Sequence, residues 1–442
     1  MDKTRTTKFV TAEEAVKAVK SHDDIVLANF CAEPRIVPDV LMDRAEELEG
    51  VRLFHLTPFG SFQDKYLIPG MDKHIRCATC FCGRRKAPRQ LLKEGRADFY
   101  PLTFGNIPKL FREGDFKCNV LMLAVSPPDA DGYCSLGVSV DYTWGALERG
   151  PRVVIAEINR YMPRTHGMTS LHISQIDYAV ENDTPVFELE QFPINETEEK
   201  IGEYVASLVD DGSTLQVGYG GVSEAATYFL KDKKDLGVHS EMIPEGLREI
   251  ATNGCVTGSK KSIHQGKITC TFHGGTSKLY EWLDDNPMIE MQPVDYTNDP
   301  KVIAMNSKMV AINAALQVDL FGNIYSDIFG LDDQYTGSGG QLDFAIGCAI
   351  SPDAKFINAV PSTTRNGKHS RIVVHPLLDL ENKHIPIIPT VPRYYADYVV
   401  TEFGIAHLKG KSNIERARRL ISIAHPDFRG ELEQQAKKIG LR

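Results

Sequence analysis

Residues 214–241 read TLQVGYGGVSEAATYFLKDKKDLGVHSE, and this stretch decides the fold class of the chain. The apolar run 214–217 is followed by a glycine-rich loop, an amphipathic segment and a second apolar run, 236–240. This order predicts a strand, a helix and a second, parallel strand. In a right-handed unit of this kind, both strands end at the same edge of the sheet. We therefore expect the glycine loop and Glu241 to meet at that edge, where open α/β sheets bind ligands.

The same alternation of apolar runs and amphipathic stretches extends along the rest of the chain. It predicts an α/β fold with two similar open α/β domains and largely parallel sheets. A polar, acidic linker at 187–194 separates an N-terminal α/β domain, 1–190, from a C-terminal α/β domain, 191–442, that carries Glu241. Expected strands lie at 24–28, 51–56, 119–125 and 153–156, and expected helices at 11–21, 36–48 and 223–231.

Two further helices are predicted from their start signals. Asn195 and Glu198 stand three residues apart at the start of an amphipathic segment, as in a capping box. Ser412 and Glu415 repeat this spacing near the C-terminus, and Pro426 marks the break before a last helix.

Composition restricts the classes of partner. The 442 residues carry a net charge of −9, which argues against nucleic-acid or anionic-membrane binding. No apolar run is long enough to span a bilayer, and the N-terminus lacks the apolar core of a signal peptide, so we expect a cytoplasmic protein. Cys77, Cys80 and Cys82 cluster together, and a zinc site would need a fourth ligand at a suitable spacing; His74 is nearby, but no second Cys pair follows. We therefore expect buried thiols and no metal site.

Three interpretations of the glycine loop and Glu241 follow from the local pattern. The loop N–H groups could hold a phosphate or an oxyanion opposite a nucleophilic carboxylate. Alternatively, Gly218 and Gly220 imitate a dinucleotide-binding fingerprint in which the acid binds a ribose, although Ser223 occupies the third glycine position. In the third interpretation the loop is only a tight turn and Glu241 a solvated strand-end residue. The local pattern leaves these alternatives open.

A second glycine cluster favours a ligand site. Residues 335–344 read YTGSGGQLDF and join a polar run to an apolar one. Two glycine-rich turns in one domain indicate that the backbone approaches a ligand from two sides. A simple nicotinamide-binding half does not require the second turn.

Several long segments then carry a family resemblance. The chain resembles the acetyl-CoA hydrolase/transferase family of class I CoA-transferases, and looks most like the 4-hydroxybutyrate and butyryl-CoA:acetate CoA-transferases. The resemblance rests on GRADFYPLTFGNIPKLFREG (95–114), VSPPDADGYCSLGVSVDYT (125–143), LQVGYGGV (215–222), GVHSEM (237–242), GSGGQLDF (337–344), YVVTEFGIAHLKGKS (398–412) and ERARRLISIAHPDFR (415–429).

The resemblance implies a site between the two domains, with Glu241 as the nucleophile that forms a glutamyl-CoA thioester. It implies acyl-CoA and a small carboxylic acid (acetate, butyrate or hydroxybutyrate) as substrates, no permanently bound cofactor, and a homodimer or homotetramer. An acetyl-CoA hydrolase is the nearest alternative, ahead of an NAD-dependent oxidoreductase or a non-catalytic acyl-CoA-binding protein. The implied CoA contacts are Gly218, Tyr219, Gly220, Gly221, Val222, Asn313, Gly337, Gly339 and Gly340.

Two departures from relatives bear on the acyl substrate. Tyr219 within the glycine loop and Pro244 just after Glu241 both fall near the expected acyl end of the site. Arg164 is a candidate partner for a substrate carboxylate, with an ordinary surface role as the alternative. His239 precedes the nucleophile by two residues, and we expect it to be structural.

Overall fold

The structure is a computed structural model that describes residues 6–83, 86–191, 193–218, 220–330, 333–364, 366–374, 377–380 and 383–441. The chain forms two compact units. Unit 1 comprises Met1–Glu190, Thr269–Thr297 and Asp332–Gly337, and unit 2 comprises Gln191–Ile268, Asn298–Leu331 and Ser338–Arg442. Unit 1 thus takes in two segments that a division at residues 190 and 191 would place in the C-terminal domain.

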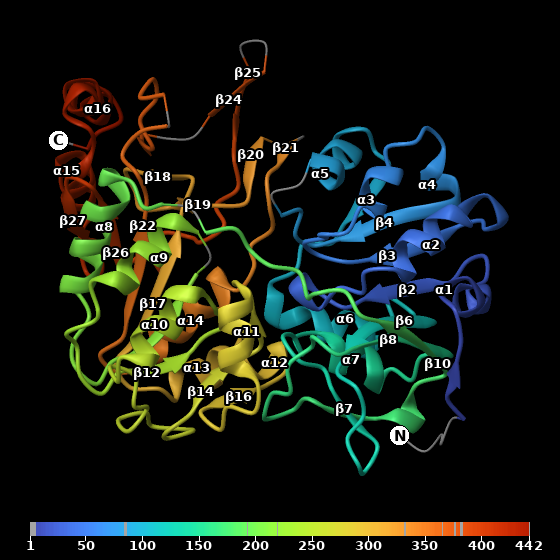
Figure 1. Cartoon of the computed structure of the whole chain (residues 1–442). Coiled ribbons are helices and arrows are strands. Elements are labelled where there is room, and N and C mark those ends of the chain that lie inside the picture. The colour runs from blue at the N-terminus through green and yellow to red at the C-terminus, as the bar shows by residue number, and fades with distance from the viewer. Residues whose placement is uncertain are drawn as a thin grey trace. The chain divides into compact units, whose positions relative to one another are not determined.

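Unit 1 is built on a sheet whose neighbouring strands are all parallel, in the order β1-β10-β8-β6-β2-β3-β4-β5 (Figure 1). Strands β6 and β8 are fully buried, and β6 is apolar throughout, as expected for a parallel sheet covered on both faces. The sheet strands are β1 (Lys8–Phe9), β2 (Asp24–Leu27), β3 (Val51–Phe54), β4 (Ile75–Thr79), β5 (Ala97–Phe99), β6 (Val120–Val125), β8 (Val153–Asn159) and β10 (Tyr178–Asn182).

Unit 1 also contains helices and shorter strands that lie outside this sheet. Its helices are α1 (Ala12–Ala15), α2 (Val37–Asp43), α3 (Phe62–Lys65), α4 (Met71–His74), α5 (Lys86–Lys93), α6 (Ile107–Glu113), α7 (Thr143–Glu148), α11 (Ser277–Leu283) and α12 (Val294–Thr297). Its smaller strands are β7 (Tyr133–Ser135), β9 (Ser170–His172), β15 (Phe272–His273), β16 (Ile289–Met291) and β21 (Asp333–Gln334), while β14 (Ile268–Cys270) begins in unit 2 and ends in unit 1.

In unit 2 the main strands run in the order β12-β11-β17-β22-β26-β27, and all these pairs are parallel except β26 with β27. They are β11 (Thr214–Val217), β12 (Gly237–His239), β17 (Met309–Ala314), β22 (Lys355–Ala359), β26 (Tyr398–Thr401) and β27 (Gly404–His407). The helices are α8 (Glu196–Ser207), α9 (Gly221–Tyr228), α10 (Glu245–Thr252), α13 (Pro300–Ala304), α14 (Gln341–Ile350), α15 (Asn413–Ile423) and α16 (Pro426–Lys438).

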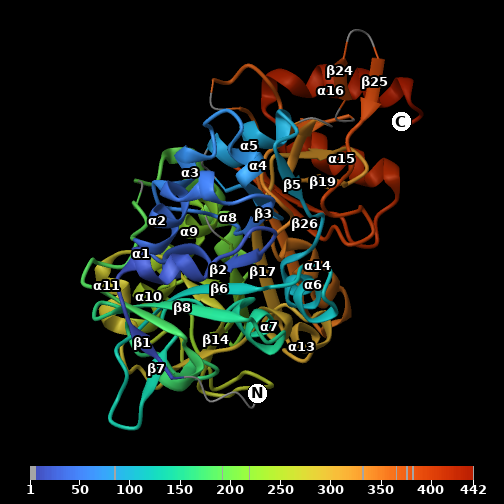
Figure 2. The same cartoon turned by 90° about the vertical axis from the view of Figure 1, so that its right-hand side faces the viewer.

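Smaller strands complete unit 2. Figures 1 and 2 both show the antiparallel pair β24 and β25 projecting as a hairpin. The core of the unit packs α14, α15 and α16 against the sheet through residues such as Phe344, Leu420 and Leu432. The smaller strands of unit 2 are β13 (Met242–Ile243), β18 (Gln317–Asp319), β19 (Ile324–Tyr325), β20 (Ile328–Gly330), β23 (Ile372–Val373), β24 (Leu377–Leu380) and β25 (Lys383–Pro386).

The fold class predicted from the sequence is confirmed. The strand, helix and parallel strand predicted at 214–241 are confirmed as well. β11 and β12 flank α9 and pair in parallel, with Thr214 opposite Gly237 and Leu215 opposite Val238. Both capping boxes are formed: the Asn195 side chain accepts from the N–H of Glu198 at 3.0 Å, and the Ser412 hydroxyl accepts from the N–H of Glu415 at 3.3 Å. No helix within the described ranges is both long and apolar enough to cross a membrane.

Candidate active site

Glu241 lies at the carboxyl edge of the unit 2 sheet, two residues after β12 ends. The preceding residue, Ser240, links this end to the neighbouring strand, because its hydroxyl accepts the backbone N–H of Val217 at 3.3 Å. Gly218 follows Val217 directly, so the glycine loop and the strand-end carboxylate leave the sheet side by side. The sheet edge predicted from the sequence is therefore the one on which both features lie.

Two groups hold the Glu241 carboxylate in place. The Asn298 side-chain amide donates to Oε2 at 3.0 Å, and the backbone N–H of Gly340 donates a second hydrogen bond. Gly340 is the N-cap residue immediately before α14, so the partial positive charge of that helix end faces the carboxylate. The same Asn298 amide also reaches Asp343 Oδ2 at 3.4 Å, within the first turn of α14.

The surroundings of Glu241 keep its carboxyl group near the midpoint of its titration at neutral pH. The pKa of Glu241 is raised to about 7. Burial is the largest cause and the negative charge of Asp343 acts in the same direction, while the hydrogen bonds from Asn298 and Gly340 oppose the rise. Part of the Glu241 surface remains accessible. A carboxylate in such an environment is poorly solvated and correspondingly more nucleophilic, and perturbed groups of this kind concentrate at functional sites.

Gly340 has no room for a side chain. A Cβ atom there would lie 2.0 Å from Glu241 Oε2 and 2.1 Å from Asn298 Nδ2. The missing side chain lets the helix end approach the carboxylate closely enough for the hydrogen bond from its backbone N–H. This close approach supports the ligand-site interpretation of the second glycine cluster.

The glycine loop after β11 combines one strained position with a helix start. Gly220 adopts φ +128° and ψ 161°, a conformation that is essentially restricted to glycine, and α9 begins at Gly221. Val222 is buried in the first turn of that helix, and Tyr219 lies outside the described residues. Gly220 has no neighbouring atom within 4 Å of an added Cβ, so its requirement for glycine comes from the backbone and not from packing.

Gly220→Ala is accordingly expected to destabilise unit 2 by roughly 1–3 kcal/mol through backbone strain alone. The measurement is urea unfolding of the variant beside the unaltered protein. An unchanged unfolding midpoint would contradict the strained conformation of this loop.

Asn313 lies in β17 and faces the neighbouring strand β11. Its side-chain amide donates to Gln216 Oε1 at 2.9 Å, and a Cβ added to Gly218 would lie 3.7 Å from Asn313 Oδ1. Asn313 is therefore beside the first glycine of the loop. Its assignment as a CoA contact remains a prediction.

The remaining glycines of the second cluster differ in their surroundings. Gly337 belongs to unit 1, where an added Cβ would lie 1.9 Å from the Cys80 carbonyl oxygen, so glycine is needed there for packing. Gly339 belongs to unit 2 and has φ +54°. Their predicted contacts with CoA remain predictions, as does the predicted position of the site between two domains.

Two functional candidates were missed by the sequence reasoning. Asn298 lies in the segment Thr297-Asn298-Asp299-Pro300, which resembles an ordinary turn before a helix. Asp343 lies within the quoted motif GSGGQLDF, but nothing in its spacing points to Glu241. Both residues become visible as site residues only through contacts across 57 and 45 positions of sequence.

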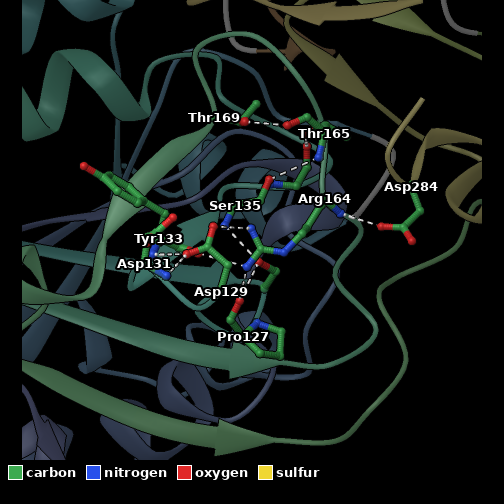
Figure 3. A network of polar contacts seen from close by, with 11 residues as sticks. Pro127, Asp129, Asp131, Tyr133, Ser135, Arg164, Thr165, Thr169 and Asp284 are labelled. Carbon is green, nitrogen blue, oxygen red and sulfur yellow. Dashed lines mark hydrogen bonds and ion pairs between the residues drawn. The ribbon is translucent and has the colours of Figure 1, made fainter. Parts of the chain in front are cut away.

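Arg164 of unit 1 is engaged in a local polar network, shown in Figure 3. Its guanidinium donates to the carbonyl oxygens of Pro127 at 2.6 Å and Tyr133 at 2.9 Å, and lies 3.5 Å from Asp129 Oδ2. The Arg164 backbone N–H donates to Asp284 Oδ1 at 2.8 Å. These contacts hold the turn between β6 and β7, which favours the ordinary structural role over substrate binding.

The other candidate groups are buried. Burial raises the pKa of the Cys77 and Cys80 thiols, and Cys82 is buried as well, as expected. Within the described ranges no three His, Cys, Asp or Glu side chains group so as to hold a metal ion. His239 is fully buried with its ring 6.4 Å from that of Phe344, and Pro244 is buried where α10 begins.

Two family models match most of the chain. Residues 2–189 match the acetyl-CoA hydrolase/transferase N-terminal domain, and residues 275–436 match the acetyl-CoA hydrolase/transferase C-terminal domain. Glu241 and the glycine loop fall between these two ranges.

Full-length relatives span that intervening region. A 4-hydroxybutyrate coenzyme A transferase from Clostridium kluyveri is 44% identical over 98% of this chain and 97% of its own length. A succinyl-CoA:cyclohexane-1-carboxylate CoA transferase from Geobacter metallireducens is 40% identical over 98% of this chain and 95% of its own. The crystal structure of RipA from Yersinia pestis has a TM-score of 0.90 at 37% identity and covers 98% of both chains. The resemblance found in the sequence is thereby confirmed, and the chain belongs to the acetyl-CoA hydrolase/transferase family.

Proposed function

We propose that the protein is a CoA-transferase that moves CoA from an acyl-CoA to a small carboxylic acid of the acetate, butyrate or hydroxybutyrate type. The observation that carries the proposal is the Glu241 carboxylate, held at the ligand-binding edge of the sheet by Asn298 and the start of α14. Relatives named as CoA-transferases over nearly the whole chain support it. Acyl-CoA and the acid are substrates, and the proposal requires no resident cofactor.

The reaction uses Glu241 as a covalent nucleophile. The ionised carboxylate attacks the acyl-CoA carbonyl, the C–S bond breaks, and CoA thiolate leaves behind an acyl-glutamyl anhydride. The thiolate then attacks the glutamyl carbonyl and displaces the first acid as a carboxylate, which leaves a glutamyl-CoA thioester. A second carboxylate reverses these steps. Both nucleophiles are anions, so no general base is needed.

Asn298 and Gly340 have two roles in this proposal. In the free enzyme they orient the carboxylate. During attack on the glutamyl carbonyl a negative charge develops on one of its oxygens, and the same two donors already face this group. Preorganised donors of this kind contribute on the order of 3 kcal/mol each to transition-state stabilisation in known enzymes.

Hydrolysis is the second candidate function, because water could attack either acyl intermediate. The test supplies one acyl-CoA with each of a panel of acids and then with none, and follows both the new acyl-CoA and the free CoA. The proposal predicts acid-dependent formation of the new acyl-CoA with little free CoA. Equal release of free CoA with and without acid would favour the hydrolase. A homodimer or homotetramer and a cytoplasmic location remain predictions from the sequence.

The pH dependence of kcat/KM for acyl-CoA tests the environment of the nucleophile. Only the ionised carboxylate attacks, so kcat/KM is expected to rise with pH and level off above the Glu241 pKa of about 7. Asp343→Asn removes a negative charge that raises this pKa, so its profile is expected to shift to lower pH. A flat profile through neutral pH, or an unshifted Asp343→Asn profile, would contradict this electrostatic account.

A further inference from the structure

A cavity of about 360 Å³ in unit 2, next to the start of α15, has an unusual lining. We call it the basic hollow. Three of its lining residues carry positive charge and none is acidic, although the chain as a whole has a net charge of −9. The lining residues are Arg393, Tyr394, Lys411, Ser412, Asn413 and Arg416.

The acidic neighbour of the basic hollow is Glu415, in the first turn of α15, which accepts the backbone N–H of Ser412 at 2.8 Å. Hydrogen bonds from Ser412 lower the pKa of Glu415, and the charge of Lys411 lowers it as well. The Arg393 guanidinium lies over the rings of Phe321 and Tyr394, at 5.7 and 5.5 Å. Arg416 donates only to backbone carbonyls, those of Phe321 at 3.0 Å, Arg393 at 2.7 Å and Lys411 at 3.3 Å. Burial and the nearby charge of Arg393 both lower the pKa of Arg416. Three like charges thus share one small space.

A second cavity in unit 2, of about 390 Å³, shows that an excess of positive charge is not a general property of the surface. There Lys355 pairs with Asp210 at 2.7 Å, and His407 lies 3.3 Å from Asp397. Lysines and aspartates line that cavity in equal numbers, so its charges are balanced within the protein. In the basic hollow one neighbouring carboxylate, Glu415, faces three cations, and an anion from solution would supply the missing negative charge.

We propose that the basic hollow binds the phosphate group of a small phosphorylated ligand. Arginine forks and a lysine ammonium are the side chains that recognise phosphate, and three cations match a doubly charged group better than a single carboxylate. Ser412 already caps α15, so the partners are side chains and not the helix end. Tyr394, which is 79% exposed, offers an aromatic face beside the charges, where a nucleoside base stacks.

Phosphate of this kind has two possible sources. One is the nucleotide end of CoA itself, which carries both a diphosphate and a ribose phosphate; this source rests on the proposed function. The other is a separate phosphorylated metabolite, which does not. The chemistry that the hollow recognises is the same in both cases, so binding is tested first and the source second.

Binding is measured by isothermal titration calorimetry of the full chain with inorganic pyrophosphate and with adenosine 3′,5′-bisphosphate. We expect saturable binding that weakens as salt is added, and a loss of at least about tenfold in affinity for Arg393→Ala and for Lys411→Ala. Arg419→Ala is the matched control, since it removes a positive charge from α15 at a position that does not line the hollow. Absence of binding, or equal affinities in all three variants, would overturn the proposal.

The source follows from kinetics with acyl-CoA and with acyl-pantetheine, which lacks the nucleotide end. If CoA supplies the phosphate, Arg393→Ala raises KM for acyl-CoA and leaves KM for acyl-pantetheine unchanged. If a separate ligand supplies it, both KM values stay unchanged while phosphate binding is lost. Tyr394→Ala is expected to weaken adenosine 3′,5′-bisphosphate more than pyrophosphate, and the reverse order would contradict the stacking role.

Discussion

Glu241→Gln is expected to lower kcat for CoA transfer by roughly 10⁴-fold or more, because an amide cannot attack the thioester. Glu241→Ala is expected to have the same effect. Steady-state assays that follow the new acyl-CoA measure both. The matched control is Glu249→Gln, which changes a partly exposed carboxylate on α10 and is expected to keep full activity.

The stability of Glu241→Gln distinguishes a loss of catalysis from a loss of folding. The folded state raises the pKa of Glu241 to about 7, above the ordinary value of 4.5, so the folded protein binds this proton more tightly than the unfolded chain does. The contribution of this group to stability is therefore present below about pH 4.5 and is lost as the pH rises towards 7. Glu241→Gln lacks this loss, so at pH 8 it should be at least as stable as the unaltered protein. Inactivity combined with a lower unfolding midpoint would point to misfolding instead.

Gly340→Ala is expected to lower kcat by about 100-fold, because the new methyl group must displace Glu241, Asn298 or the start of α14. The added Cβ would lie 2.0 Å from the carboxylate oxygen, far inside contact distance. Overpacking of this kind also costs about 1–3 kcal/mol of stability. Kinetics and urea unfolding of the same preparation measure both effects.

Gly430→Ala provides the control for this substitution. It makes the same chemical change within α16, at a position where an added Cβ meets no atom within 4 Å. Alanine in a helix interior is more favourable than glycine, so this variant should be as stable as the unaltered protein or more so by about 0.5–1 kcal/mol. Full activity in Gly340→Ala would show that the close approach of α14 does not position the carboxylate.

Much of unit 2 could be predicted because its signals are local. The order of apolar run, glycine loop and apolar run predicted β11, α9 and β12, and the capping boxes predicted the starts of α8 and α15.

In unit 1, the helix expected at 11–21 is shorter, with α1 ending at Ala15 and a 3₁₀ turn following to Ala18. The chain must turn within a few residues to enter β2 at Asp24, which leaves no room for further helical turns.

The site itself could be predicted only in part, for a physical reason. Glu241 could be identified because strand topology places it at a known edge. Asn298 donates to it from 57 positions away in the sequence. Asp343 accepts from the same Asn298 amide and acts on Glu241 through its charge, and only the packed structure shows that these residues meet. The membership of Thr269–Thr297 in unit 1 is likewise set by tertiary contacts that no local pattern records.

The central claim is that Glu241 becomes covalently linked to CoA. The most direct measurement incubates the protein with an acyl-CoA, reduces it with borohydride and maps the peptide masses. The account predicts reduction confined to the peptide that contains Glu241, present only when acyl-CoA is supplied and absent in Glu241→Ala. An unmodified Glu241 peptide, together with CoA transfer surviving in Glu241→Ala, would contradict it.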